Sequence, residues 1–171
     1  MAEDTPYLIE LLQNRHDRSQ FSCGKEELDT YLKRQAGQDV RRNISVCYVL
    51  VEEGGQEVCG YYTLSAFGIN LADLPSEIAQ RLPRYPVVPA TLVGRLAIDR
   101  QHGGRRLGER LLMDALHRSL QQSEHIASSA VVVEAIDEEA RAFYLHFDFL
   151  PFPDYRNRLF LPMRTIASLF R

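Results

Sequence analysis

The chain has 171 residues, of which 45% are apolar and 25% are charged, as in ordinary globular proteins. At about 150 residues per domain, this length predicts one domain over residues 1–171, large enough to build a core without disulfides or a structural metal. The formal net charge of −3 excludes a protein that coats nucleic acid through bulk basicity, so any contact with nucleic acid must be local.

No apolar run approaches the roughly 18 residues that a membrane span requires. The N-terminal segment MAEDTPYLIE is acidic and lacks the basic and apolar regions of a signal peptide. We therefore expect a cytoplasmic protein that does not contact membranes. The three cysteines, Cys23, Cys47 and Cys59, form no CxxC pair and no known zinc spacing with the histidines, so we expect free thiols and no metal.

The first half of the chain predicts a strand, a helix and a hairpin. In order, the expected elements are a strand at Tyr7–Leu12, a helix at Lys25–Ala36 that continues to Arg42, and strands at Ser45–Glu52 and Glu57–Ile69. Gly54-Gly55 is the strongest turn signal between the two strands. With a two-residue turn, Leu50 would face Cys59 and Cys47 would face Tyr62, so Cys47 and Cys59 would not be partners.

The second half alternates between strands and helices after a proline-rich crossover over residues 70–89. The expected elements are a short helix at Ser76–Leu82, a strand at Thr91–Ile98, a loop at Asp99–Arg105, a helix from Arg106 to Gln122, a strand at Ala130–Ala135, a helix around Ala140–Phe147, a strand at Arg158–Leu161 and a terminal helical turn at Met163–Phe170. This pattern predicts an α/β fold.

The most informative segment is the strand–loop–helix unit GRLAIDRQHGGRRLGERLLMDAL, residues 94–116. A glycine-bearing loop that opens into a helix offers backbone N–H groups and the positive end of the helix dipole to a pyrophosphate. Arg105 and Arg106 add positive charge there. The loop lacks the Gly-Lys-Ser/Thr ending of a P-loop, and its glycines do not fit G-x-G-x-x-G. On spacing alone, a simple glycine turn with solvated arginines explains the segment equally well.

This unit resembles motif A of the GNAT superfamily of N-acetyltransferases, whose loop wraps the pyrophosphate of acetyl-CoA. Gly103 stands at the first position of the motif, Gly104 and Gly108 match its first and last glycines, and Arg106 replaces the central glycine. The resemblance implies that acetyl-CoA is bound by the loop and by backbone N–H groups of the preceding strand. The residues concerned are Leu96, Ala97, Ile98, Gly103, Gly104, Arg105, Arg106, Leu107 and Gly108.

The resemblance extends along nearly the whole chain to the acetyltransferase toxins of bacterial toxin–antitoxin pairs. The stretches that carry it are FSCGKEELDTYL, CYVLVEEGGQEVCGYYTLSA, LPRYPVVPATLVGRLAIDR, VVVEAIDEEARAFYLHFDF and RLFLPMRTI. It implies a GNAT fold, that is, a mixed, mostly antiparallel sheet splayed at the acetyl-CoA site with flanking helices. It also implies acetylation of the α-amine of aminoacyl-tRNA, arrest of translation, a ribbon-helix-helix antitoxin and a homodimer. Asp148 stands where these relatives usually have glycine.

Tyr144 occupies the position of the family's tyrosine that protonates the coenzyme thiolate. Without the resemblance, Tyr144 would be assigned to the core stripe of its helix. The general base stays open among Glu134, His102 and His146. A dedicated base is not required, because the α-amine of an aminoacyl ester arrives largely neutral.

The residues that bind the acceptor substrate are expected among local basic groups, which would contact the phosphates of the tRNA. These residues are Lys33, Arg34, Arg41, Arg42 and Arg95, with Arg81 and Arg84 nearby in the crossover. Basic surface residues are also common as simple solvated faces. Two alternatives to the toxin function remain: a GNAT enzyme that acetylates a small amine or a protein N-terminus, and a non-catalytic module that binds acyl-CoA.

Overall fold

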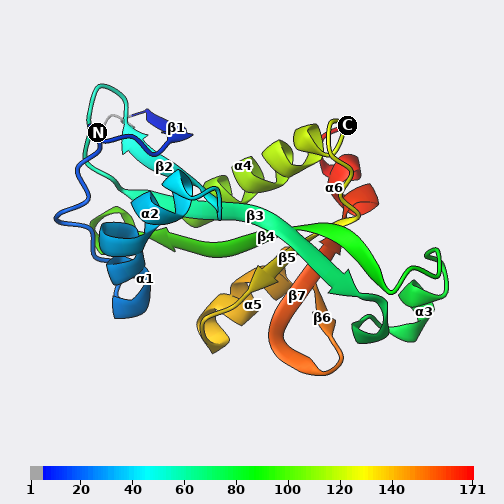
Figure 1. Cartoon of the computed structure of the whole chain (residues 1–171). Helices are drawn as coiled ribbons and strands as arrows, with labels where there is room; N and C mark the ends of the chain where they lie inside the picture. The colour runs from blue at the N-terminus through cyan, green and yellow to red at the C-terminus, as the bar shows by residue number, and fades with distance from the viewer. Residues whose placement is uncertain (1–5) are drawn as a thin grey trace. The chain divides into compact units, whose positions relative to one another are not determined.

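The computed structural model describes residues 6–171, in which strands and helices alternate along most of the chain (Figure 1). The start of the N-terminal segment, for which no signal peptide was predicted, lies outside the described residues. The elements are β1 (Tyr7–Leu11), α1 (Glu26–Thr30), a π-helical segment (Tyr31–Gln35), α2 (Ala36–Arg41), β2 (Val46–Glu52), β3 (Gly60–Asn70), a 3-10 turn (Leu71–Asp73), α3 (Ser76–Ala79), β4 (Val87–Ile98), a second 3-10 turn (Arg100–His102), α4 (Leu107–Gln122), β5 (Ala130–Glu134), α5 (Glu138–His146), β6 (Leu150–Phe152), β7 (Tyr155–Pro162) and α6 (Met163–Leu169).

The strands form one mixed sheet in the order β1-β2-β3-β4-β5-β7-β6. β4 pairs with β5 in parallel, over residues 91–93 against 131–133. The pairs β1–β2, β2–β3, β5–β7 and β6–β7 are antiparallel. The predicted mixed, mostly antiparallel α/β fold is therefore confirmed. The splay of the sheet at the coenzyme site stays a prediction.

The chain forms two compact units, one from the residues up to Leu64 together with Arg95–Ala115, and the other from Ser65–Gly94 together with Leu116–Arg171. The division falls within β3, β4 and α4, so each unit combines separate stretches of chain. The prediction of a single domain over residues 1–171 stays a prediction.

The core of the first unit lies between the helical segment 26–41 and one face of β2 and β3 (Figure 1). Leu28, Leu32 and Ala36 recur at helical spacing and are buried against this face. The Tyr61 hydroxyl donates to the Leu28 carbonyl at 2.7 Å. On the opposite face, the Tyr62 hydroxyl donates to Asp114 of α4 at 2.6 Å. Helices therefore cover both faces of this part of the sheet.

The predicted register of the β2–β3 hairpin is wrong by one residue. Leu50 pairs with Gly60 rather than with Cys59, and Cys47 pairs with Thr63. The reason is a long-range backbone contact. The Asp17 carbonyl accepts from the Val58 N–H, and the Asp17 N–H donates to the Gln56 carbonyl. These bonds hold residues 56–58 in a loop that joins β2 and β3, in place of a two-residue turn. The two cysteines are not cross-strand partners, as predicted, and all three thiols are free.

The second unit has its own core between β5, β7, β6 and the crossover segment. Val132, Phe152 and Phe160 are buried there with Ile69 and Val88. β6 was not predicted, because its three residues include Pro151, which weakens a strand pattern. No helix among residues 6–171 combines the length and apolar character needed to cross a bilayer.

Candidate coenzyme loop, candidate acid and basic surface

The end of β4 is anchored by Asp99, a buried carboxylate that precedes the predicted coenzyme loop. Asp99 accepts hydrogen bonds from the backbone N–H groups of Ser22 at 2.9 Å and Gln101 at 2.8 Å. Its own N–H donates to the carbonyl of Cys59 at 2.8 Å. The loop therefore begins at a point that is held by three segments of the first unit.

The loop itself turns through two left-handed residues. Gly104 has φ +78°, and Arg106, which replaces the central glycine of the motif, has φ +55°. Arg106 thus adopts the conformation that glycine would adopt there, at a cost of about 1–2 kcal/mol for a residue with a side chain. The replacement of the central glycine by Arg106 therefore leaves the glycine-like backbone conformation of the loop in place.

The beginning of α4 presents the donors that a pyrophosphate site needs. The first helical bond that enters α4 from the loop runs from the Arg110 N–H to the Arg106 carbonyl at 3.1 Å. The N–H groups of Leu107, Gly108 and Glu109 come before that bond, and helix geometry leaves such groups without intrahelical partners. Residues 103–106 are exposed, whereas Leu107 is buried and fixes the helix start. The arrangement suits an anion at the helix N-terminus.

The side chain of Arg105 is held by β1 rather than lying free beside the loop. One guanidinium nitrogen donates to the Tyr7 hydroxyl at 2.7 Å. The same hydroxyl is also hydrogen-bonded to His102 Nδ1, which is 3.0 Å away. Arg110 also donates to the Tyr7 carbonyl at 2.8 Å. Sequence analysis missed this link, because no local pattern connects residues almost a hundred positions apart.

The strand residues expected to face the coenzyme divide between two sides of β4. Ala97 is buried in the core beneath α1 and α2, while Leu96 and Ile98 are half-buried. Ile98 lies over Gly60, where an added Cβ would come within 2.7 Å of its Cδ1. The contact of their backbone with the coenzyme stays a prediction.

Tyr144, the predicted acid, lies in α5 of the second unit and is 4% exposed. Its ring packs against Phe143 and Phe149, with centroids 5.3 Å and 5.5 Å away. Burial raises the pKa of the Tyr144 hydroxyl above its usual value, so the proton is present at neutral pH. The position is that of a core aromatic, and the catalytic role stays a prediction.

The candidate bases differ in their surroundings. Glu134 is exposed at the end of β5 and lies 3.4 Å from a guanidinium nitrogen of Arg158. The Arg158 guanidinium also lies over the Tyr155 ring, 4.5 Å from its centroid. His102 is engaged with Tyr7, whereas His146 is exposed next to Phe147. His102 belongs to the first compact unit, and Glu134 and His146 belong to the second.

The residues predicted to bind the acceptor tRNA, Lys33, Arg34, Arg41 and Arg42, are all exposed. The first three lie on the continuous helical segment that ends at Arg41, and Arg42 follows it directly. Arg95 is placed differently, because its guanidinium stacks on the Tyr31 ring 3.5 Å from the centroid. The Tyr31 hydroxyl donates to Asp39 at 2.7 Å, and hydrogen bonds from Gln35 and Tyr31 lower the pKa of Asp39. Tyr31 begins the π-helical segment, a distortion frequent at functional sites that hydrophobic spacing did not reveal.

Comparison with known proteins identifies the family. A model of the acetyltransferase (GNAT) family matches residues 8–149. The chain belongs to this family.

The similar proteins include toxins. The tRNA-acetylating toxin of Mycobacterium tuberculosis is 37% identical over 158 residues, which cover 92% of this chain and 93% of the relative. The solved structure of AtaT complexed with acetyl-methionyl-tRNAfMet superposes with a TM-score of 0.89 at 31% identity, covering 97% of this chain and 100% of that chain. A Tyr-to-Phe variant of AtaT, bound to the C-terminus of the antitoxin AtaR and acetyl-CoA, gives a TM-score of 0.82 at 28% identity, covering 96% and 98%.

Proposed function

We propose that this GNAT acetyltransferase moves the acetyl group of acetyl-CoA to the α-amine of aminoacyl-tRNA and thereby blocks translation. The observation that carries the proposal is the similarity along almost the full length to AtaT, solved with an acetylated aminoacyl-tRNA. The backbone N–H groups at the start of α4 support it, because they suit an anion such as the pyrophosphate of acetyl-CoA.

In the proposed reaction, the neutral amine attacks the thioester carbonyl, the carbon–sulfur bond breaks and the nitrogen releases one proton. The loop residues Gly103 to Gly108 bind the pyrophosphate, and backbone N–H groups of Leu96, Ala97 and Ile98 contact the acetyl oxygen and the pantetheine. Tyr144 donates its hydroxyl proton to the departing thiolate. The α-amine proton passes to water or to a base, which stays open among Glu134, His102 and His146, and the Tyr144 hydroxyl recovers its proton from solvent before the next turnover. No step requires a metal.

The acceptor binds through its phosphates to Lys33, Arg34, Arg41 and Arg42, with Arg95 held against the same helical segment by Tyr31. We place the enzyme in the cytoplasm, where charged tRNA is used. Its partners are a ribbon-helix-helix antitoxin and a second copy of the chain. The complex of AtaT with the C-terminus of AtaR supports the antitoxin.

The direct test is mass spectrometry of total aminoacyl-tRNA after incubation with the protein and labelled acetyl-CoA. We expect the label on the α-amine, and its loss from the RNA once the ester is hydrolysed. Induced expression should arrest growth. Rapid acetylation of a free polyamine or peptide, with charged tRNA untouched, would instead establish the small-amine alternative. Absence of any acetyl-CoA binding at hundreds of micromolar would leave neither enzyme hypothesis standing.

A further inference from the structure

Three side chains with metal-binding atoms meet beside the base of the coenzyme loop. They are Glu52 at the end of β2, Cys59 just before β3 and His102 just before Gly103, and one ligand atom from each lies within 4.8 Å of the other two. Among residues 6–171 this is the one such group of three. Thiolate, imidazole and carboxylate are the ligands that Zn²⁺ takes in proteins. We propose that Glu52, Cys59 and His102 form a zinc site, with water as the fourth ligand.

The backbone around the three ligands is already fixed, so the metal need not organise it. The Cys59 N–H donates to the Leu50 carbonyl at 2.8 Å, and the Cys59 carbonyl accepts from Asp99 at 2.8 Å. The His102 N–H in turn donates to the Asp99 carbonyl at 3.0 Å. Cys59 and His102 are therefore held to one residue, Asp99, by two short bonds.

A tetrahedral zinc centre requires the ligand atoms to lie closer together than the 4.8 Å within which they meet in the structure. Zn–S and Zn–N bonds of about 2.3 Å and 2.0 Å place neighbouring ligand atoms roughly 3.3–3.8 Å apart. Glu52 Oε1 lies 3.9 Å from His102 Nδ1. The Glu52 side chain is 42% exposed, so its carboxylate has room to rotate toward the other two ligands.

His102 presents Nδ1 to the other members of the group. This atom lies 3.0 Å from the Tyr7 hydroxyl and 3.9 Å from Glu52 Oε1, and a neutral imidazole binds a metal through the nitrogen that carries no proton. A zinc ion at Nδ1 takes the place of the Tyr7 hydroxyl as the partner of this nitrogen, so the Tyr7–His102 hydrogen bond is lost on zinc binding.

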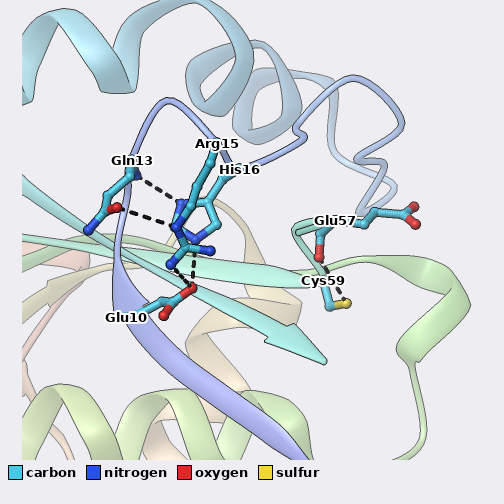
Figure 2. A network of polar contacts seen from close by, with 6 residues as sticks. All are labelled: Glu10, Gln13, Arg15, His16, Glu57 and Cys59. Carbon is cyan, nitrogen blue, oxygen red and sulfur yellow. Dashed lines mark hydrogen bonds and ion pairs between the residues drawn. The ribbon is translucent and has the colours of Figure 1, made fainter. Parts of the chain in front are cut away.

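The Cys59 thiol has only a weak partner to give up. Its Sγ lies 3.5 Å from the Glu57 carbonyl, a contact that Figure 2 shows at the start of β3. Cys23 is the matched thiol for comparison, since its Sγ likewise lies 3.5 Å from a backbone carbonyl, that of Lys25. The two cysteines differ in that Cys59 belongs to the group with Glu52 and His102.

The experiment titrates ZnCl₂ into the untagged, chelator-treated protein in a calorimeter and repeats the titration with CoCl₂ in a spectrophotometer. We expect one Zn²⁺ per chain at micromolar affinity or tighter, and a sulfur-to-cobalt charge-transfer band. Cys59→Ser and His102→Gln should each weaken Zn²⁺ binding at least tenfold. Cys23→Ser and His125→Gln, which change a matched thiol and an exposed imidazole, should bind as the parent does.

Glu52→Gln gives a third test at a more exposed side chain, should Cys59→Ser or His102→Gln fail to fold, and we expect it also to weaken binding. Less than one Zn²⁺ per chain, a cobalt spectrum without the thiolate band, or wild-type affinity in both Cys59→Ser and Glu52→Gln would overturn the zinc site. None of these measurements depends on acetyl transfer, so failure of the proposed function would leave the result intact.

Discussion

At the scale of single residues, the two positions that depart from the glycines of the family have glycine-like backbones. Arg106 has φ +55° and Asp148 has φ +69°. Asp148 closes α5: its N–H donates to the Leu145 carbonyl, and the Phe149 N–H donates to the Tyr144 carbonyl. This pair of bonds is the Schellman arrangement, in which the residue at the Asp148 position is usually glycine.

We predict that Asp148→Gly raises the free energy of unfolding by about 0.5–1 kcal/mol, because it removes left-handed strain from a side-chain-bearing residue. Urea denaturation measures the change. The control is Asp154→Gly, at an exposed turn residue without a positive φ, which should lower stability instead. A stability loss at Asp148 comparable to that of the control would show that the aspartate side chain matters more than the backbone.

The Tyr144 hydroxyl gives a second prediction at this scale. Tyr144→Phe should leave folding and coenzyme affinity nearly unchanged, since the aromatic contacts with Phe143 and Phe149 remain. Acetyl transfer should fall about 10²-fold or more, the usual contribution of a general acid. Steady-state kinetics with charged tRNA measures this, and expression of the variant should not arrest growth. Wild-type turnover with an unchanged pH profile would make Tyr144 a core residue only.

At the scale of elements, the start of α4 should determine coenzyme affinity. A Gly108→Val side chain would occupy the space where phosphates approach the helix N-terminus, so we expect the dissociation constant of acetyl-CoA to rise at least tenfold. Calorimetry with acetyl-CoA provides the measurement. Gly54→Ala in the hairpin turn, which has no atom within 4 Å of the added Cβ, should leave the constant unchanged although φ +83° makes it less stable. Equal affinities for both variants would move the phosphate site away from α4.

The end of β1 is bonded to the following loop through the carboxylate of Glu10, so the stability of this contact depends on pH. His16 Nε2 donates to Glu10 at 2.7 Å and Arg15 donates at 2.6 Å (Figure 2), and these bonds, that of His16 first, hold the pKa of Glu10 below its usual value of 4.5. A depressed pKa means that the stabilisation is present above 4.5 and is lost as the pH falls through the folded-state value.

Glu10→Gln should therefore lower the melting temperature more at pH 7 than at pH 3. The effect should be modest, because the Glu10 side chain is 30% exposed. Thermal unfolding monitored by circular dichroism at both pH values tests this. Glu53→Gln, which removes an exposed carboxylate from the nearby hairpin loop, is the control. An equal loss at both pH values would mean that the carboxylate charge is not the stabilising feature.

At the scale of the whole molecule, a net charge of −3 must coexist with binding of a polyanion. The exposed cations at the end of α2 are the expected contact. Arg41→Glu and Arg42→Glu together should raise the KM for charged tRNA while leaving the KM for acetyl-CoA unchanged. The slope of log K for tRNA binding against log salt concentration should also become shallower. The change should be about 0.7–0.9 for each phosphate that the double variant no longer neutralises. Arg164→Glu, at an exposed cation on α6, is the control, and a wild-type salt dependence in the double variant would exclude this surface.

The sequence by itself determined most elements, the coenzyme motif and the family. Apolar residues at helical spacing in α4, alternation in β2 and β3, and a glycine loop before a helix are local features, and short-range sterics and burial act on them directly. The resemblance then pointed to Tyr144 and the acetyl-CoA loop. The structure left these roles as predictions but supplied the glycine-like conformation of Arg106 on which the loop depends.

Only the tertiary structure decided the strand register and the contacts between residues that are distant in the sequence. The hairpin register changed because Asp17 pairs with its loop, Arg105 turned toward Tyr7, and Glu52, Cys59 and His102 came together from three separate segments. The π-helical segment likewise showed only once the helix was packed against the sheet. Contacts between residues distant in sequence depend on the packing of whole elements, and local periodicity carries no record of them.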